Sequence, residues 1–146
     1  KKRLNEGYDY VLCLVDMDVI LSNQEKLRQY KLLQKQNRKI EFIESNPCTE
    51  YWFLMHYMPR SSSKEYSTYE AVAKELRKYI PDYDKSEEFF NKTDIYKYLK
   101  ENSNMPRAVE ISRDLDHLRT NEPDVYKSYS QMYKLFDKIQ EITQKK

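Results

Sequence analysis

Two aspartates with the spacing D-x-D stand directly after an apolar run of the chain. Asp16 and Asp18 follow Tyr8–Val15 (YDYVLCLV). Residues two apart on a strand share a face, with Cα atoms about 6.6 Å apart, so two carboxylates there can converge on a hard cation such as Mg²⁺ or Mn²⁺. The ordinary alternative is a pair of strand-end acids that face water, and the spacing alone does not decide between the two.

A second polar segment, Ser45–Glu50 (SNPCTE), follows the next expected strand. Asn46 is the expected N-cap of a helix, and Pro47 its first residue. We interpret Ser45, Asn46 and Pro47 as a structural motif. Glu50 lies one turn into that helix, where an acid complements the helix dipole. It is equally placed to act as a third carboxylate beside the two aspartates.

The chain contains two histidines, His56 and His117. His56 lies six residues after Glu50 on an apolar helix, and His117 follows two nearby aspartates. A lone histidine on a packed helix is either a functional acid or base or a hydrogen-bonded core residue. Neither histidine has zincin spacing, so zinc is not expected.

Basic residues are concentrated between Gln24 and Glu41, where six lysines and arginines stand against two acids. We select Lys31, Lys35 and Arg38 as candidate nucleic-acid contacts, since such a surface attracts a phosphate backbone. A solvated helix face is the alternative interpretation.

The composition favours one helix-rich domain. The chain has 146 residues, 14 Tyr and a single Gly, which argues against glycine-rich phosphate loops and hairpin-rich all-β folds. A net charge of +2 does not by itself indicate a nucleic-acid binder. The longest apolar run is too short for a membrane span. With only two cysteines, we expect reduced thiols and a cytoplasmic location.

The elements that must position the acidic residues form a βαβ unit. A strand over Tyr8–Val15 is followed by Ser22 and Glu25 at the spacing of a capping box. The helix that they open should run to about Gln36 and bury Leu27, Tyr30 and Leu33. A second strand over Lys39–Glu44 alternates apolar and charged residues. The predicted class is therefore α/β, with a parallel sheet whose strand ends carry the polar segments.

Mostly helical segments are expected after the second strand. An apolar helix over 51–58 is followed by a loop over 59–63 and a helix capped by Ser67 that ends near Ile80. Further helices are expected over 86–91, 94–101, 106–118 and 128–142. A two-stranded sheet is marginal alone, so we expect either helices that cover it or further strands before Lys1, and favour the second.

Two motifs resemble the RloB-like family, which is related to the Toprim fold. The first is Tyr8–Asp18, similar to the family's strand ending in D-x-D. The second is Ser45–His56, similar to its signature S-N-P-C-x-E-x-W-x-L-x-H. Weaker matches are Tyr83–Lys85 and Tyr133–Phe136. The resemblance covers residues 8 to 140, and the long signature is its specific part.

The resemblance implies a Mg²⁺-dependent, nuclease-like protein of bacterial restriction, phage-defence and abortive-infection loci. It implies nucleic acid as substrate and an ATPase partner encoded nearby, and no membrane. Asp16 and Asp18 match the metal-binding pair of Toprim proteins. Glu50 and His56 match the signature and become the candidate catalytic residues. The alternatives are a non-catalytic interaction or nucleic-acid-binding module that partners a defence ATPase, and a structural domain with a buried polar pair.

The same resemblance implies one domain over residues 1–146. A Toprim-like βαβα core would span 1–58, and a helical region 59–146. Toprim folds also carry a glutamate after an earlier strand. Glu6 directly precedes the D-x-D strand and does not match it, so we expect the chain to correspond to the C-terminal part of the family's domain.

Overall fold

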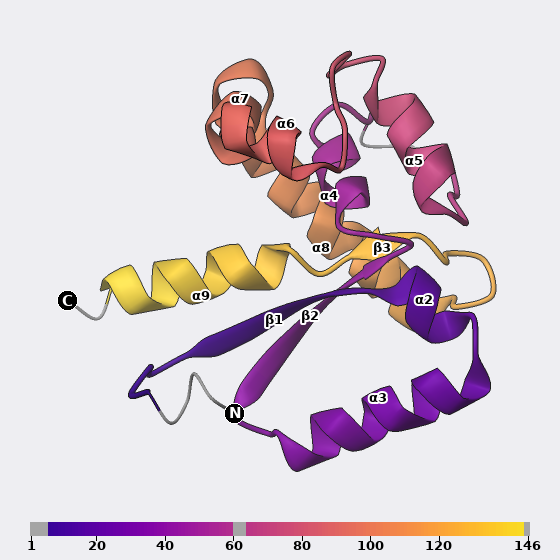
Figure 1. The fold of residues 1–146 in the computed structure, drawn as a ribbon. Helices are drawn as coiled ribbons and strands as arrows, with labels where there is room; N and C mark the ends of the chain where they lie inside the picture. Colours follow the sequence, from indigo (N-terminus) through magenta and orange to yellow (C-terminus); the bar gives the residue numbers. More distant parts are fainter. Residues whose placement is uncertain (1–5, 60–63, 145–146) are drawn as a thin grey trace.

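The computed structural model describes residues 6–59 and 64–144, and they form a helix-rich α/β fold around a small mixed sheet. The strand order is β1-β2-β3. Strand β1 (Val11–Asp16) pairs in parallel with β2 (Ile40–Asn46), and the short β3 (Tyr129–Ser130) pairs antiparallel with β2 (Figure 1). The predicted βαβ unit is therefore confirmed. The third strand, by contrast, lies inside a segment that we expected to be helical.

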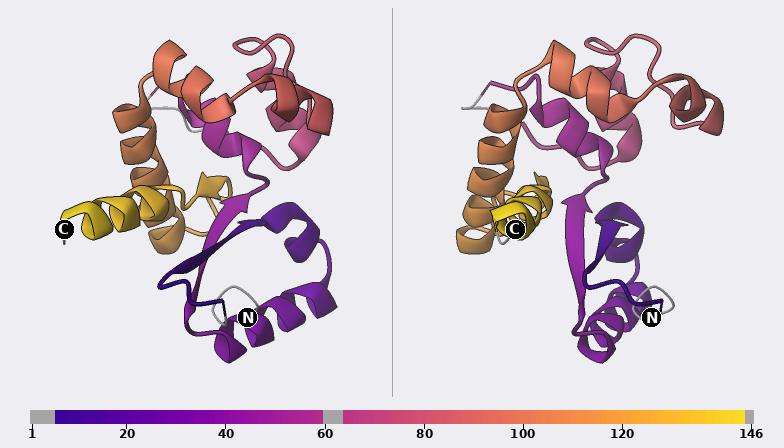
Figure 2. Two further views of the ribbon diagram at one scale, coloured as in Figure 1. Left: turned by 60° about the vertical axis from the view of Figure 1, so that its left-hand side comes forward. Right: turned by 90° about the vertical axis from the view of Figure 1, so that its left-hand side faces the viewer.

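Helices lie on both sides of the sheet. Two views agree that α2 (Met17–Leu21) and α3 (Gln24–Gln36) lie on one side, with α8 (Met105–Asn121) and α9 (Tyr133–Gln144) on the other (Figure 2). Helices α4 (Glu50–Met55), α5 (Tyr69–Leu76), α6 (Glu87–Lys92) and α7 (Ile95–Asn102) gather beyond the carboxyl ends of β1 and β2 (Figures 1 and 2). This edge of the sheet is where α/β proteins bind ligands.

The chain turns into helix α2 immediately after β1. Met17 is buried and begins the helix, so the strand ends at Asp16. The capping box expected at Ser22 is wrong by one residue. Asn23 caps α3 and accepts hydrogen bonds from the N–H groups of Glu25 and Lys26, whereas Ser22 ends α2 and donates to the carbonyl of Val19.

Helix α3 packs less deeply than its periodicity predicts. Tyr30 is its one buried residue in the structure, and it meets Phe42 edge-on and donates to Glu44 at 2.9 Å. Leu33, expected in the buried stripe, is 48% exposed. The sheet that α3 covers is narrow, so only the middle of the helix finds a packing partner.

The helix that follows β2 begins later than predicted. Asn46 still belongs to β2, where it pairs with Tyr129, and its side-chain amide donates to the carbonyl of Lys127. The Asn46–Pro47 peptide is cis, and Pro47 precedes the helix. The N-cap of α4 is Thr49. The expected roles of Asn46 as N-cap and Pro47 as first helical residue are therefore wrong, because sheet pairing holds Asn46 in an extended conformation.

The remaining helices follow the predicted order with shifted ends. Ser86 and Asp94 cap α6 and α7 through their side chains, but Thr68 caps α5 in place of Ser67. The expected helix over 128–142 begins only at Tyr133. Most of the expected loop over 59–63 lies outside the described residues.

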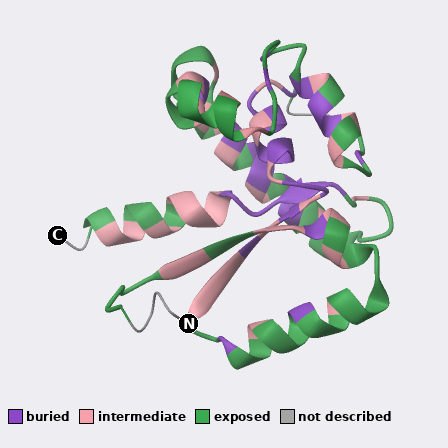
Figure 3. Ribbon diagram, viewed as in Figure 1, coloured by how far each residue is buried: buried purple, intermediate pink, exposed green. Residues whose placement is uncertain are grey.

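The core forms around α4, as its continuous apolar sequence predicts. Tyr51, Trp52, Leu54 and Met55 are all buried, and they belong to one cluster with side chains of α5, α7 and α8. Burial is concentrated there and at β3, while α3 is largely exposed and α9 mixes residues of intermediate burial with exposed ones (Figure 3). Strand β1 stands at one edge of the sheet, with Cys13 and Leu14 exposed. Further strands beside it stay a prediction.

Candidate active site

The ends of the two parallel strands are joined through the carboxylate of Asp16. Its Oδ1 accepts hydrogen bonds from the backbone N–H of Thr49 at 2.8 Å and from the Thr49 hydroxyl at 2.7 Å. Asp16 pairs with Ser45 in the sheet register, so the residues beyond the two strands lie side by side. The N–H of Asp18 also donates to the carbonyl of Pro47 at 3.0 Å. The two polar segments of the sequence are thus brought together, as predicted.

Glu50 extends this polar site into the protein interior. It is only 3% exposed, and the hydroxyl of Tyr83 donates to its Oε1 at 2.9 Å. Buried acids require compensating partners, because burial of an unpaired charge is costly. The second partner of Glu50 is the ammonium group of Lys85, whose Nζ lies 3.2 Å from Oε1.

Lys85 joins the two carboxylates. Its Nζ also lies 3.2 Å from Oδ2 of Asp16, and 5.1 Å from the centre of the Tyr69 ring. Partial burial lowers the pKa of Lys85, but the charges of Glu50 and Asp16 outweigh it and hold the pKa above its ordinary value. Asp16, Glu50 and Lys85, which we call the carboxylate–lysine cluster, come from three separate segments of the chain.

Sequence reasoning did not select Lys85 or Tyr83 as site residues. Both belong to the Tyr83–Lys85 segment, which resembles the family only weakly. That segment follows α5 and reaches the strand ends through long-range contacts, which no local pattern specifies. The family motif was the one signal that could have identified them.

Asp18 does not join this cluster. Because α2 begins at Met17, Asp18 lies on a helix and not on the strand face of Asp16, and its Oδ1 accepts from the N–H of Val19 at 2.6 Å. Among residues 6–59 and 64–144, no three His, Cys, Asp or Glu side chains form a group suited to a metal ion. The expected convergence of three carboxylates is therefore not present in this conformation.

Two carboxylates do fit a divalent ion of the Mg²⁺ type. Asp16 and Glu50 already hold one cationic nitrogen, each at 3.2 Å. In proteins Mg²⁺ is commonly held by one or two carboxylates while it keeps several waters and contacts substrate phosphates. The donor set is therefore chemically suitable for such an ion, and in the structure it holds the ammonium group of Lys85.

His56 lies in the packed core. Its Nδ1 shares a 2.7 Å hydrogen bond with the hydroxyl of Ser103, and its ring meets Trp52 edge-on. Burial lowers the pKa of His56 to about 4, so the imidazole is neutral at pH 7. Its Nε2 is buried without a hydrogen-bond partner among the described residues. Its hydrogen bond and its ring contact within the described part of the chain are made with residues outside the carboxylate–lysine cluster. His117 is exposed on α8.

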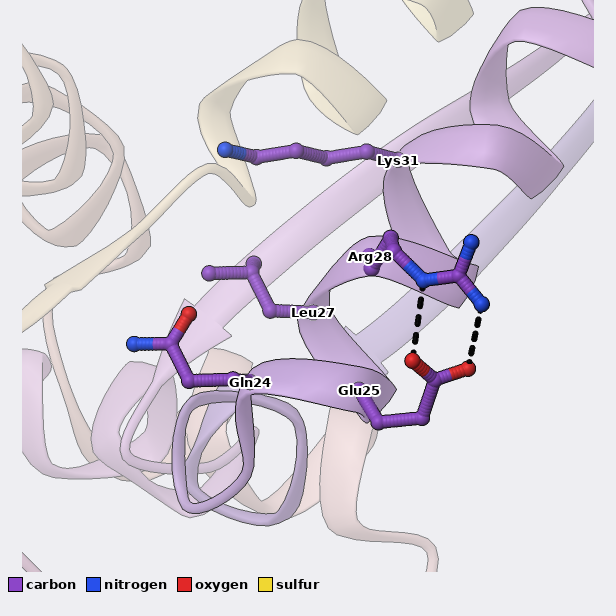
Figure 4. A pocket seen from close by; sticks show the side chains of 5 residues that line it. All are labelled: Gln24, Glu25, Leu27, Arg28 and Lys31. Carbon is purple, nitrogen blue, oxygen red and sulfur yellow. Dashed lines mark hydrogen bonds and ion pairs between the residues drawn. The ribbon is translucent and has the colours of Figure 1, made fainter.

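The basic candidates Lys31, Lys35 and Arg38 are exposed on or just after α3. Figure 4 shows Lys31 at a hollow of α3, with its amine pointing away from Arg28, which forms two 2.8 Å bonds with Glu25. Because α3 returns the chain to the start of β2, Arg38 lies near the amino end of the sheet. That position is roughly 17 Å along the strand direction from the level of Asp16.

The residues around Glu50 in the second motif have structural contacts. The Ser45 hydroxyl bonds to that of Ser130 at 2.8 Å, both buried. Cys48 is buried, and burial together with the charge of Glu50 raises the pKa of its thiol. The motif thus fixes the path of the chain between β2 and α4 and directs Glu50 toward Asp16.

The two motifs and the cluster that they build are accompanied by a family match over nearly the whole chain. The family model described as RloB-like protein matches residues 1–139. The chain belongs to the RloB-like family. No match was found among the curated proteins or among the solved structures. The carboxylate–lysine cluster of this RloB-like chain lies entirely within the matched region.

The helices of the RloB-like chain are too short or too polar to be membrane spans within residues 6–59 and 64–144.

Proposed function

We propose that this RloB-like chain is a Toprim-related, Mg²⁺-dependent nuclease-like component of a bacterial phage-defence or restriction system. One observation supports this most directly. The carboxylates of Asp16 and Glu50 share one cationic group, the ammonium of Lys85, at the carboxyl ends of two adjacent parallel strands. An ATPase partner is part of the proposal and comes from the family resemblance alone.

The roles of the residues follow from their contacts. Asp16 and Glu50 would hold the ion, which when bound would activate water and stabilise charge on a phosphodiester. Thr49 orients Asp16 through two hydrogen bonds, and Tyr83 orients Glu50 through one. Asp18 stays a candidate ligand, because its backbone bond to Pro47 keeps it at the same edge of the sheet. The buried position of His56 favours a structural role.

Divalent-metal titration tests the site directly. Mn²⁺ binding, followed by the loss of its free-ion magnetic resonance signal, should be abolished by Asp16→Asn and by Glu50→Gln. Glu88→Gln is the matched control, because Glu88 pairs with Lys92 on the exposed surface of α6 and does not belong to the carboxylate–lysine cluster. Metal binding that is unchanged in both site variants would refute the proposal.

Nucleic-acid cleavage tests the activity. Labelled single- and double-stranded DNA and RNA should be incubated with the chain and Mg²⁺, with and without the ATPase encoded beside it. Cleavage should require Mg²⁺ and disappear in Asp16→Asn. Cleavage that persists in that variant would place the chemistry elsewhere.

The second candidate function is a non-catalytic nucleic-acid-binding module. It is favoured by the exposed basic residues Lys31, Lys35 and Arg38, which lie away from the acidic edge. Charge reversal at these three positions should then abolish binding while Asp16→Asn retains it. Such binding should also weaken steeply with salt, as counterion release requires.

A further inference from the structure

The ammonium group of Lys85 has the coordination of a bound cation. It lies 3.2 Å from one oxygen of Asp16 and 3.2 Å from one oxygen of Glu50, between segments that are distant in the sequence. Around it, Thr49 donates to the other oxygen of Asp16, and Tyr83 donates to the same Oε1 of Glu50 that pairs with Lys85. The carboxylates are therefore held in place whether or not a metal ion is present.

The ion pairs of Lys85 neutralise the negative charge of Asp16 and Glu50 when no metal ion is bound. Glu50 is 3% exposed, and an ionised carboxylate at that depth is strongly destabilising unless a positive charge lies next to it. Lys85 is the cation that meets this need in the structure. A site built from Asp16 and Glu50 alone would carry two negative charges whenever the metal was absent.

The side chain of Lys85 can also move away from the two carboxylates. Its side chain is 47% exposed, so its stem is not locked in the core. The face of the Tyr69 ring already lies 5.1 Å from Nζ in this position, so the ammonium group can keep a cation–π contact when it moves off the carboxylates. A small shift of the side chain would thus release both carboxylates without exposing the lysine charge to an apolar surface.

We propose that Lys85 is an internal counter-cation that occupies the metal site of the resting protein and is displaced when a divalent ion binds. The inference rests on the proposed function. As a consequence, the metal ion must compete with a tethered ammonium group. It therefore fills the site only at a higher metal concentration than it would without Lys85. Lys85 would thus limit the metal-loaded state of the protein.

Mn²⁺ titration of the full chain tests the competition. Lys85→Met, which keeps the unbranched stem of the side chain and removes the charged end, should bind Mn²⁺ at least about tenfold more tightly than the wild type, since a like charge next to the ion is lost. Lys85→Arg should remain as weak as the wild type. Lys92→Met is the matched control, since Lys92 pairs with Glu88 on the exposed surface of α6, and its Mn²⁺ affinity should not change. The double variant Asp16→Asn with Lys85→Met should lose the gain.

A second measurement uses the wild-type protein and does not depend on the folding of a variant. Acetylation of individual lysines by an activated ester, followed by mass spectrometry, reports how accessible each neutral amine is. Saturating Mg²⁺ should raise the modification rate of Lys85 several-fold and leave that of Lys92 unchanged.

The outcomes separate the inference from the function on which it rests. Equal Mn²⁺ affinity in wild type and Lys85→Met, or a Lys85 modification rate insensitive to Mg²⁺, would overturn the inference and leave the metal site standing. Failure of both proteins to bind Mn²⁺ would overturn the metal site and the inference together.

Discussion

The hydroxyl group of Tyr83 donates a 2.9 Å hydrogen bond to Oε1 of Glu50, and both side chains are almost completely buried. Glu50 lies in the first turn of α4, whereas Tyr83 follows α5, 33 residues later. Burial, reinforced by the charge of Glu50, raises the pKa of Tyr83 well above its ordinary value. The bond thus ties the helical region to the edge of the sheet where the carboxylates lie.

Replacement of Tyr83 by phenylalanine should lower the free energy of unfolding by about 1–3 kcal/mol, since a buried carboxylate loses one of its donors. The ring itself keeps its contacts with Phe53 and Phe89. Urea denaturation measures the change. Tyr96→Phe is the control, because Tyr96 is 56% exposed, and it should unfold like the wild type. Equal stability of the two variants would contradict the role assigned to the bond.

The buried imidazole of His56 should make the protein less stable in mild acid. Its pKa is about 4 in the folded state and about 6.5 in an unfolded chain. The contribution of the neutral imidazole to the free energy of unfolding is therefore fully present above pH 6.5. It decreases as the pH falls toward 4, because the unfolded chain binds the proton more readily. The loss amounts to roughly 3 kcal/mol across this window.

Urea denaturation between pH 4 and 7.5 measures this dependence by comparison with variants. In His56→Gln the difference from wild type should shrink as the pH falls, because the variant has no imidazole to protonate. His117→Gln should track the wild type, since His117 is exposed. A constant difference between wild type and His56→Gln over the whole range would refute the assignment.

The two thiols should differ sharply in reactivity. Cys13 is exposed on β1, whereas Cys48 is 1% exposed and has a raised pKa. The native protein should therefore react rapidly with one equivalent of a disulfide reagent, and with a second only after denaturation. Native Cys13→Ser should show no rapid reaction. Rapid reaction of Cys48 in the native protein would show that the segment before Glu50 opens easily.

Local patterns in the sequence predicted the sheet edge but not the contacts made there. The apolar run before Asp16 and the alternating segment before Ser45 predicted two parallel strands, and these pair in register. The D-x-D spacing, however, predicted a shared strand face. This prediction is wrong because Met17 is buried and begins a helix directly after Asp16. Tertiary packing decides whether the chain continues as a strand or turns into a helix after Asp16.

The cap residues show the same limit at a smaller scale. Ser22 and Ser67 each precede a residue, Asn23 and Thr68, that is equally able to cap a helix, and the structure uses the second of each pair. Lys85 could not be placed at all from spacing, because its partners Asp16 and Glu50 lie 69 and 35 residues away. Long-range electrostatic pairing leaves no periodic trace in a sequence.

Thr49 offers the finest test of how the site is oriented. Its hydroxyl donates to Oδ1 of Asp16 at 2.7 Å, and its backbone N–H donates to the same oxygen at 2.8 Å. Thr49→Val removes the first bond, keeps the second and preserves the shape of the side chain. Because Asp16 is 31% exposed, water can replace the lost donor, and the free energy of unfolding should fall by only about 0.5–1.5 kcal/mol.

Mn²⁺ binding to Thr49→Val should nevertheless weaken by about threefold to tenfold, since one hydrogen bond no longer orients the carboxylate of Asp16. Thr143→Val, at an exposed hydroxyl that donates to carbonyls of its own helix α9, should change neither quantity. Full metal affinity in Thr49→Val would mean that the backbone N–H alone positions Asp16.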